Sequence, residues 1–282
     1  MMFSRSRIEL KSPQQLGHMA AAGAILSEAL DATLAAAAPG VTTSALNDVF
    51  AELITARGAK PNFLNYHGFP GYICTSVNDE VVHGIPGERV LQAGDVLKVD
   101  GGCIVEGWHS DSARTLILGD ATAGTADPED ERLSQITSSA MWRGIAAFAE
   151  AKSTGEIGEA IEEYVAAQSG RPLGILEDYV GHGIGSQMHM APDVFNYSTG
   201  MKGARIKPGM ALAIEPMLTR GGIETRVLED DWTVVTTDGS HASQWEHSVA
   251  RHAEGIWVLT AADGGASELE PLGVTPVPIP AA

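Results

Sequence analysis

The sequence feature that most constrains the fold is a set of four carboxylate residues and one histidine, spread along the chain in a fixed order. They are Asp100, Asp111, His182, Glu215 and Glu246. Most of them lie in or beside a short segment predicted to be a strand, a strand end or a glycine loop. Carboxylates gathered around one imidazole repel each other, but two divalent cations would cancel that repulsion. The sequence therefore predicts a fold that collects these residues into a two-metal hydrolytic site.

Composition argues against several other classes of protein. The chain has 282 residues, enough for one large domain or two smaller ones, and its hydrophobic content of 44% is ordinary for a soluble globular protein. Its formal net charge of −18 disfavours nucleic acid and anionic membranes as partners. The apolar run at residues 19–26 is too short to cross a membrane, and the first residues lack the apolar core of a secretory signal. The two cysteines, Cys74 and Cys103, predict no disulfide framework, so we expect a cytoplasmic protein.

The chain divides into three parts. We expect a short N-terminal arm over residues 1–11, one domain over residues 12–262 and a C-terminal tail over residues 263–282. The tail is rich in proline and glycine, which predicts an extended or loosely packed end.

Capping signals predict the helices. Ser12 followed by proline indicates the start of a long helix, and Thr43 is expected to cap a second one. Asp127, also followed by proline, begins a helical pattern that runs to about Gly170 with a break near residues 153–155. The remainder of the chain reads mainly as short strands and glycine loops.

Two β-like runs, residues 95–105 and 112–118, are expected to form a hairpin. The spacing of Asp100 and Asp111 then places both carboxylates on one face, directly or diagonally opposed, as a metal pair requires. A bulge at Gly101–Gly102 would shift this register.

A weak internal echo suggests a duplicated fold. The segment LQAGDVLKVD ends at Asp100, and IKPGMALAIE ends at Glu215. A second acidic residue follows each segment, Asp111 in the first case and Glu246 in the second. Two α/β halves related by a pseudo-twofold axis would bring both acidic pairs together.

The donor types indicate the metal. Carboxylates with one imidazole suit Mn, Fe(II) or Co better than structural zinc, which prefers thiolate and imidazole ligands. Two further histidines, His83 and His189, lie in loops near proline and have catalytic character.

At this point the residues match a known family. The chain resembles type I methionine aminopeptidases in several segments: NYHGFP (65–70), SVNDEVVHGIP (76–86), DVLKVDGG with Asp111 after it, GHGIG with His189 and Pro192 after it, KPGMALAIEP (207–216) and QWEHSV (244–249). The resemblance covers residues 12–260. It implies the pita-bread fold, an α/β (α+β) architecture of pseudo-twofold duplicated halves, with a central curved antiparallel sheet flanked by helices.

The resemblance implies an enzyme that removes the initiator methionine from nascent proteins and peptides, preferably before a small second residue. A hydroxide bridging two divalent ions would attack the scissile carbonyl. Asp100, Asp111 and Glu246 would bridge or chelate the ions, with His182 and Glu215 on one of them. Glu215 would also shuttle a proton.

The remaining site residues are implied in the same way. His83 is similar to the family's histidine near the substrate amino end and scissile amide, and His189 to the one that hydrogen-bonds the carbonyl oxygen. A methionine pocket would be lined by aromatic and sulfur groups, which suit a thioether. Its residues would be Tyr66, Phe69, Cys74 and Trp232, with Phe63 and Met188 nearby.

Some positions depart from the common pattern without removing a ligand. They are Gly71, Val82, Met188 and Trp245. The 33-residue interval between His182 and Glu215 leaves no room for the extra helical subdomain of type II enzymes, so type I is favoured.

Two alternatives stay open. One is an Xaa-Pro dipeptidase or aminopeptidase of the same fold, which usually carries a separate N-terminal domain. The other is a non-catalytic binding protein on this fold, which loss of a ligand would mark. We expect a peptide or nascent polypeptide as partner and a monomeric protein, with ribosome docking left open by the acidic surface.

Overall fold

The structure, a computed structural model, describes residues 8–119 and 124–280 of the chain. Five α-helices are described: α1 (Pro13–Ala36), α2 (Thr43–Ala56), α3 (Pro128–Glu150), α4 (Gly155–Ala166) and α5 (Ala266–Leu269). The strands are β1 (Lys60–Pro61), β2 (Ile73–Val77), β3 (Glu80–Val82), β4 (Val96–Val105), β5 (Trp108–Ile117), β6 (Gly174–Ile175), β7 (Gly181–Gly183), β8 (Met190–Val194), β9 (Ala211–Ile214), β10 (Met217–Thr219), β11 (Thr225–Val227), β12 (Val234–Thr236), β13 (Ala242–Gln244), β14 (His247–Arg251) and β15 (Ile256–Val258). Short 3-10 turns, η1 (Tyr66–Gly68) and η2 (Glu270–Leu272), complete the described elements.

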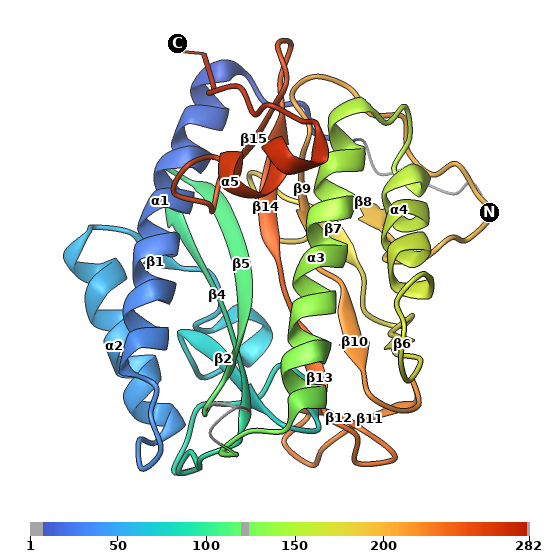
Figure 1. Ribbon diagram of the computed structural model, residues 1–282. Helices are drawn as coiled ribbons and strands as arrows, with labels where there is room; N and C mark the ends of the chain where they lie inside the picture. The colour runs from blue at the N-terminus through green and yellow to red at the C-terminus, as the bar shows by residue number, and fades with distance from the viewer. Residues whose placement is uncertain (1–7, 120–123, 281–282) are drawn as a thin grey trace, which may run out of the picture.

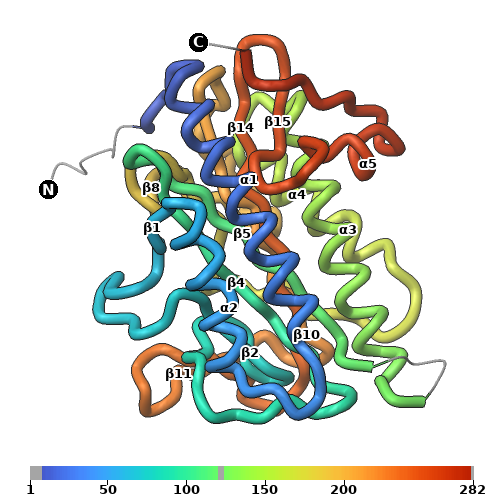
Figure 2. Tube along the Cα trace, turned by 90° about the vertical axis from the view of Figure 1, so that its left-hand side faces the viewer, coloured from blue at the N-terminus to red at the C-terminus, as the bar shows by residue number. Residues whose placement is uncertain are grey.

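The N-terminal half is a helix pair on an antiparallel sheet. Strands β1, β4 and β2 are neighbours, and β5 pairs with β4. Helices α1 and α2 cover this sheet, as the side view in Figure 2 shows. Their apolar faces form one core, in which Leu26, Phe50 and Leu97 are fully buried. This half thus buries most of its hydrophobic surface itself, while Leu16 and Met19 of α1 pack in a smaller core shared with the C-terminal half.

The C-terminal half repeats that plan. A five-stranded sheet in the order β15-β14-β9-β7-β8 packs against α3 and α4. Figure 1 shows the two helix pairs on either side of the central strands. A second core joins Phe148 and Ile161 to the strand residue Leu212, all fully buried. The predicted pair of duplicated halves is thus confirmed.

A seam between β5 and the segment leading into β14 joins the halves. The Glu246 N–H donates to Ala113 O at 2.9 Å, and the Ala113 N–H donates to Glu246 O at 3.3 Å. The Ser248 hydroxyl donates to Asp111 O at 2.8 Å and accepts from the Asp111 N–H at 2.9 Å. These bonds hold two metal-ligand candidates, Asp111 and Glu246, in a fixed register across the seam.

The hairpin register confirms the predicted shared face. Asp100 pairs with Ala113 and Asp111 pairs with Gly102, so the two carboxylates are diagonal neighbours on one face. The pairing runs without interruption from one end of the hairpin to the other, so no bulge displaces them.

Helix boundaries follow the capping signals with one correction. Ser12 caps α1 with a full capping box, and the predicted break near residue 153 separates α3 from α4. The cap of α2 is Thr42, whose hydroxyl accepts from the Ala45 N–H, whereas Thr43 is the first helical residue. Adjacent threonines offer the same hydroxyl, so local sequence did not distinguish them.

The tail is better packed than its composition predicted. It contains α5 and a 3-10 turn, Leu269 is fully buried, and the Val277 N–H donates to Ile256 O at 2.8 Å. The expectation of an extended or loosely packed end is wrong for residues 266–272, because Leu269 and Leu272 pack on the core of the C-terminal half. Residues 274–280 contain no helix or strand. Residues 1–7 of the expected arm lie outside the described residues.

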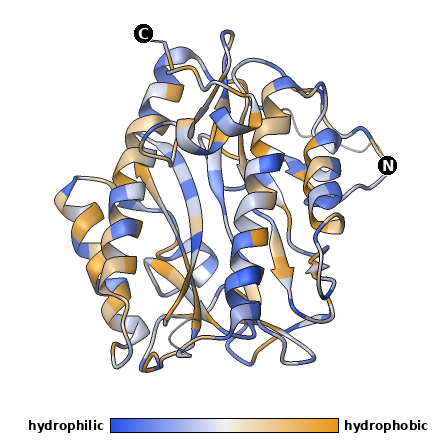
Figure 3. Ribbon diagram, in the orientation of Figure 1, coloured by the Kyte–Doolittle hydropathy of each residue, from blue (hydrophilic) through white to orange (hydrophobic). Residues whose placement is uncertain are grey.

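Helix α1 is long and apolar enough to match a membrane span by length and composition. Figure 3 shows hydrophobic colour along much of it. It packs against α2, β4 and β5, which is the position of a core helix in a globular fold.

A glycine pair in α1 provides a test of this packing. A Cβ at Gly23 would lie 2.1 Å from Leu259 O, whereas a Cβ at the exposed Gly17 meets no described residue within 4 Å. We expect Gly23→Ala to lower the free energy of unfolding by about 1–3 kcal/mol through overpacking. Gly17→Ala, the matched control, should raise it by up to about 1 kcal/mol through helix propensity. Urea unfolding measures both; equal effects in the two variants would contradict the close contact.

Candidate metal centre and substrate pocket

The five predicted ligand residues meet at one cavity. Asp100 and Asp111 come from β4 and β5, and His182 from β7. The β9–β14 ladder pairs Ile214 with His247, and the β10–β13 ladder continues in the same register. Glu215 and Glu246 therefore fall opposite each other between these two ladders. All five residues line the same cavity, of about 160 Å³.

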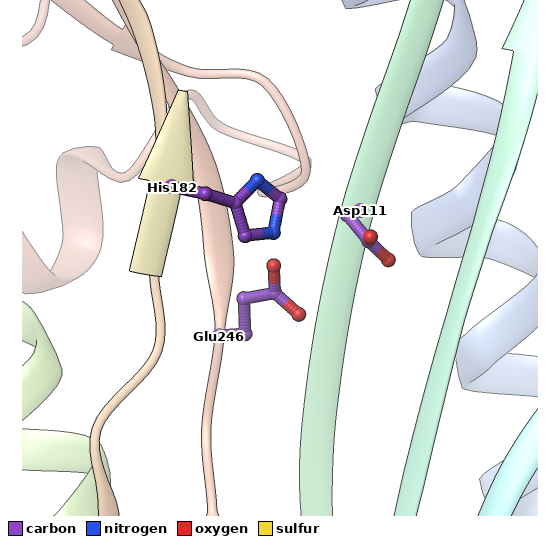
Figure 4. A group of neighbouring side chains, drawn as sticks. All are labelled: Asp111, His182 and Glu246. Carbon is purple, nitrogen blue, oxygen red and sulfur yellow. The ribbon is translucent and has the colours of Figure 1, made fainter. Parts of the chain in front are cut away.

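Three of the five side chains converge most closely. Figure 4 shows the His182 ring and the Glu246 carboxylate facing each other, with Asp111 on the neighbouring strand β5. One ligand atom from each lies within 4.8 Å of the others. A further carboxylate, that of Glu215, places its Oε1 3.4 Å from His182 Nε2. The arrangement brings oxygen and nitrogen donors from both halves to one point.

Burial dominates the electrostatics of this cluster. The four carboxyl groups are nearly inaccessible to solvent. Burial raises the pKa of Asp100 to about 7. Burial and the neighbouring carboxylates raise the pKa values of Asp111, Glu215 and Glu246 well above the usual range. Without a cation, the fold therefore favours protons on these groups.

His182 is held as a neutral ligand. Its Nδ1 lies 3.0 Å from Gly183 O, so Nδ1 carries the proton and donates, which leaves the Nε2 lone pair directed into the cavity. Burial lowers the pKa of His182 to about 3, and the ring is uncharged at neutral pH. A neutral imidazole with a fixed tautomer is the form that binds a metal ion.

The buried oxygens fit a divalent cation. Asp100 Oδ1, Asp111 Oδ1 and Glu246 Oε1 are inaccessible to solvent and have no hydrogen-bond partner among the described residues. Buried acceptors without partners are rare and call for an explanation. Carboxylate oxygens with one imidazole form a hard donor set that suits a divalent ion. The residues present therefore fit the metal that the sequence predicted.

An apolar wall completes the cavity. Phe63, Phe69, Cys74 and Met188 form one buried cluster, with Tyr66 and Trp232 packed against it. Phe69 contacts Phe63 and Trp232 edge to face, with ring centroids 6.3 and 5.0 Å apart. Every residue predicted for the methionine pocket lines this cavity. The wall is aromatic and sulfur-rich, which suits a flexible apolar side chain.

Both additional histidines lie at the same cavity. His83 has a positive φ of 61°. The centroid of its ring lies 6.3 Å from the ring centroid of Trp232. Burial, with a smaller contribution from His189, lowers the pKa of His83 to about 4, so it is neutral. His189 Nδ1 lies 2.9 Å from Tyr66 Oη, and its ring centroid is 4.3 Å from that of His182. The structure thus brings together every predicted site residue.

Gln244 is a cavity residue that the sequence reasoning did not assign. Its Nε2 donates to Asp100 Oδ2 at 3.3 Å, and this hydrogen bond partly offsets the burial that raises the pKa of Asp100. The residue opens the QWEHSV segment, two positions before Glu246. That spacing places it on the same strand face as the ligand, which is the signal that could have identified it.

Comparison with known proteins agrees with this site. The chain matches metallopeptidase family M24 over residues 17–251. It therefore belongs to that family of metallopeptidases. Within it, the chain groups with the methionine aminopeptidases of type I: it is 44% identical over 260 residues to methionine aminopeptidase 1 of Mycobacterium tuberculosis, covering 91% of this chain and 96% of that protein. For methionine aminopeptidase 1 of Bacillus subtilis the identity is 38%, with coverage of 89% and 98%.

Solved structures confirm the pita-bread fold. A methionine aminopeptidase from Rickettsia prowazekii superimposes with a TM-score of 0.84 at 36% identity, covering 90% of this chain and all of that one. A prolidase from Pyrococcus furiosus superimposes with a TM-score of 0.69 at 19% identity and shares the fold alone. This chain covers 65% of that prolidase.

The raised carboxyl pKa values predict how metal binding depends on pH. A buried carboxyl group with a raised pKa stabilises the folded protein while it is protonated. This stabilisation is complete below the group's ordinary pKa and is lost as pH rises through the raised value, which is about 7 for Asp100. A bound cation reverses that loss, because it binds the ionised groups. The rise in Tm caused by Mn(II) should therefore grow between about pH 5 and 8, reaching roughly 5–10 °C at saturation.

Thermal unfolding with Mn(II) or with EDTA, at a series of pH values, measures this difference directly. Surface variant Glu150→Gln should behave as wild type, and Asp100→Asn should reduce the metal-dependent rise. A rise that is constant or that shrinks with increasing pH would contradict the assignment of these carboxylates as ligands.

Proposed function

We propose that this chain removes the N-terminal methionine from peptides and nascent proteins, preferably before a small second residue. The observation that carries the proposal is a single cavity in which an apolar, sulfur-lined wall meets the buried carboxylates and His182. Its relatives named methionine aminopeptidase cover most of the chain, which supports the same activity here.

In the proposed enzyme the metal centre would bind two divalent ions, and Mn, Fe(II) and Co are the candidates. Asp100, Asp111, Glu246, His182 and Glu215 would hold the ions. When bound, such ions supply Lewis-acid activation of water and polarise a carbonyl oxygen. The orphaned oxygens of the cluster support this assignment.

Glu215 is the proposed proton carrier. Its carboxylate lies inside the cavity next to His182, with Oε1 3.4 Å from Nε2 of the ring. That position allows a Glu215 oxygen to take a proton from the attacking water and pass it to the leaving amine nitrogen. Burial excludes bulk water from the transfer, which keeps the proton within the site.

The two further histidines bind the reacting amide. Tyr66 Oη bonds to Nδ1 of His189 and orients the ring, which leaves Nε2 to hydrogen-bond the carbonyl oxygen of the substrate as negative charge develops. His83 is neutral and lies beside Trp232, where it contacts the amide and the amino end of the substrate. Neutral rings can do this without repelling the ammonium group of the substrate.

Two alternatives are less well supported. An Xaa-Pro peptidase would share the ligand set, but the prolidase relationship rests on fold similarity at 19% identity. A non-catalytic binding protein would not need the complete ligand set and both histidines lining one cavity. We further propose a cytoplasmic, monomeric enzyme that meets its substrates as peptides or nascent chains.

The first test compares two peptides. Metal-stripped protein should be inactive, and Mn(II) or Co(II) should restore release of methionine from Met-Ala-Ser without cleavage of Ala-Pro. Glu215→Gln should abolish turnover because it removes both the proton carrier and a metal ligand, whereas Glu150→Gln on the surface should retain it. Cleavage of Ala-Pro would favour the Xaa-Pro alternative, and turnover of neither peptide would favour the binding protein.

His189 is expected to act mainly in the transition state. His189→Ala should lower kcat by about 10²–10³-fold, with KM changed only a few-fold, because its bond strengthens as the oxyanion forms. Tyr66→Phe removes only the orienting hydrogen bond and should lower kcat less. Steady-state kinetics on Met-Ala-Ser measures both; a rise in KM at unchanged kcat would place His189 in ground-state binding instead.

A further inference from the structure

The N-terminal arm docks against a loop of the candidate active site. This loop, residues 184–189, connects β7 to β8 and is called the β7–β8 loop below. The Glu9 carboxylate accepts from the Ser186 N–H at 3.1 Å and from the Ser186 hydroxyl at 2.5 Å. Figure 2 shows the beginning of the described chain close to β8. One side chain of the arm thus satisfies two donors at the tip of a distant loop.

Two glycines in the sequence motifs make room for the arm. A Cβ at Gly185 would lie 2.3 Å from Glu9 Oε1 and 2.2 Å from Lys11 Cε. A Cβ at Gly209, where φ is +92°, would lie 2.8 Å from Lys11 O. The Lys11 N–H also donates to Gly209 O at 2.7 Å. At Gly209 the arm's backbone and the positive φ both exclude a side chain, whereas at Gly185 a side chain would displace the ends of Glu9 and Lys11.

Charge also favours this contact. The Lys11 side chain is buried, and its Nζ lies 3.5 Å from Glu9 Oε1 and 3.3 Å from Glu9 O. Burial alone would raise the pKa of Glu9, but the Ser186 and Lys11 contacts outweigh it and lower that pKa. Glu9 is thus an ionised acceptor at neutral pH, and charge-assisted hydrogen bonds are the stronger ones.

The β7–β8 loop carries two cavity residues immediately beyond its tip. Met188 forms part of the apolar wall, and His189 lies beside Tyr66. A backbone bond also ties the tip to the fold: the His109 N–H donates to Gly185 O at 2.9 Å. Within the loop, the Gly185 N–H donates to Gln187 O at 3.0 Å. Ser186 itself is exposed, so Glu9 provides its hold on the rest of the fold.

We propose that Glu9 is a positioning residue for the reaction: by clamping Ser186, it fixes the β7–β8 loop and thereby sets Met188 and His189 at the cavity. The catalytic part of this proposal rests on the proposed aminopeptidase function. A displacement of about 1 Å in a positioning group can cost up to about 10²-fold in rate. Loss of one clamp should therefore reduce kcat/KM by about tenfold without unfolding the protein.

A double-mutant cycle tests the clamp in the metal-loaded, full-length chain. Glu9→Ala should lower kcat/KM for Met-Ala-Ser by about tenfold, and Ser186→Ala, which keeps the backbone bond, should lower it less. The double variant should lose no more than Glu9→Ala alone. Glu28→Ala, which breaks a surface ion pair with Arg57, is the matched control and should keep full activity. Tm should change by no more than about 2 °C in Ser186→Ala and Glu28→Ala, and should fall further in Glu9→Ala because the buried Lys11 loses its carboxylate partner.

Hydrogen exchange provides the second measurement. Amide exchange in the β7–β8 loop should become faster in Glu9→Ala, while exchange in α1 and β4 stays as in wild type. Unchanged loop exchange, additive losses in the cycle, or full activity of Glu9→Ala would each overturn the clamp. If wild-type protein releases no methionine, the proposed function fails; loop exchange still decides separately whether Glu9 holds the loop.

Discussion

The structure depends on the backbone seam that joins β5 to the segment entering β14. Ala113 and Glu246 exchange N–H···O bonds across this seam, and Ser248 exchanges two with the backbone of Asp111. None of these bonds uses a carboxylate group, so they form whether the carboxylates are protonated, ionised or bound to a cation. The fold can therefore hold four mutually repelling acids in one cavity without relying on the acids themselves for cohesion. A metal ion then finds its ligands already assembled, which reduces the entropy lost on binding.

The two halves supply the hydrophobic stability of the fold. Each half closes its own core with a helix pair, so neither depends on the cavity between them for its hydrophobic stability. The strands that face the seam are consequently free to carry polar side chains at positions that an ordinary core would fill with apolar ones. Orphaned oxygens on Asp100, Asp111 and Glu246 are costly in isolation. These unpaired oxygens are tolerated because the large hydrophobic cores of the two halves offset the free energy of burying them.

Much of the site could be predicted from sequence because strand geometry is local. Side chains alternate along a strand with a period of two, so the spacing of Asp100 and Asp111 sufficed to place both on one face, and the structure shows them as diagonal neighbours. The echo between the segments ending at Asp100 and Glu215 likewise indicated two halves. Contacts between residues far apart in the chain were not predictable in this way. Gln244 reaches Asp100 and Glu9 reaches Ser186 only because the fold brings them together, and the tail packs through Leu269 despite a composition typical of a loose end.

A further distinction separates the groups that hold metal from those that meet substrate. Three of the proposed metal ligands lie within strands and two directly beside them, where ladder hydrogen bonds fix the backbone. His83 and His189 lie in connections, where no ladder does so, and each is held by special means: His83 by a turn with positive φ, His189 by Tyr66 and by a loop that the arm clamps. A peptide substrate must enter and leave, so its contacts belong on segments that can move. Mobile segments position their side chains less precisely. Docked side chains such as Glu9 restrict this movement without contacting the metal ligands.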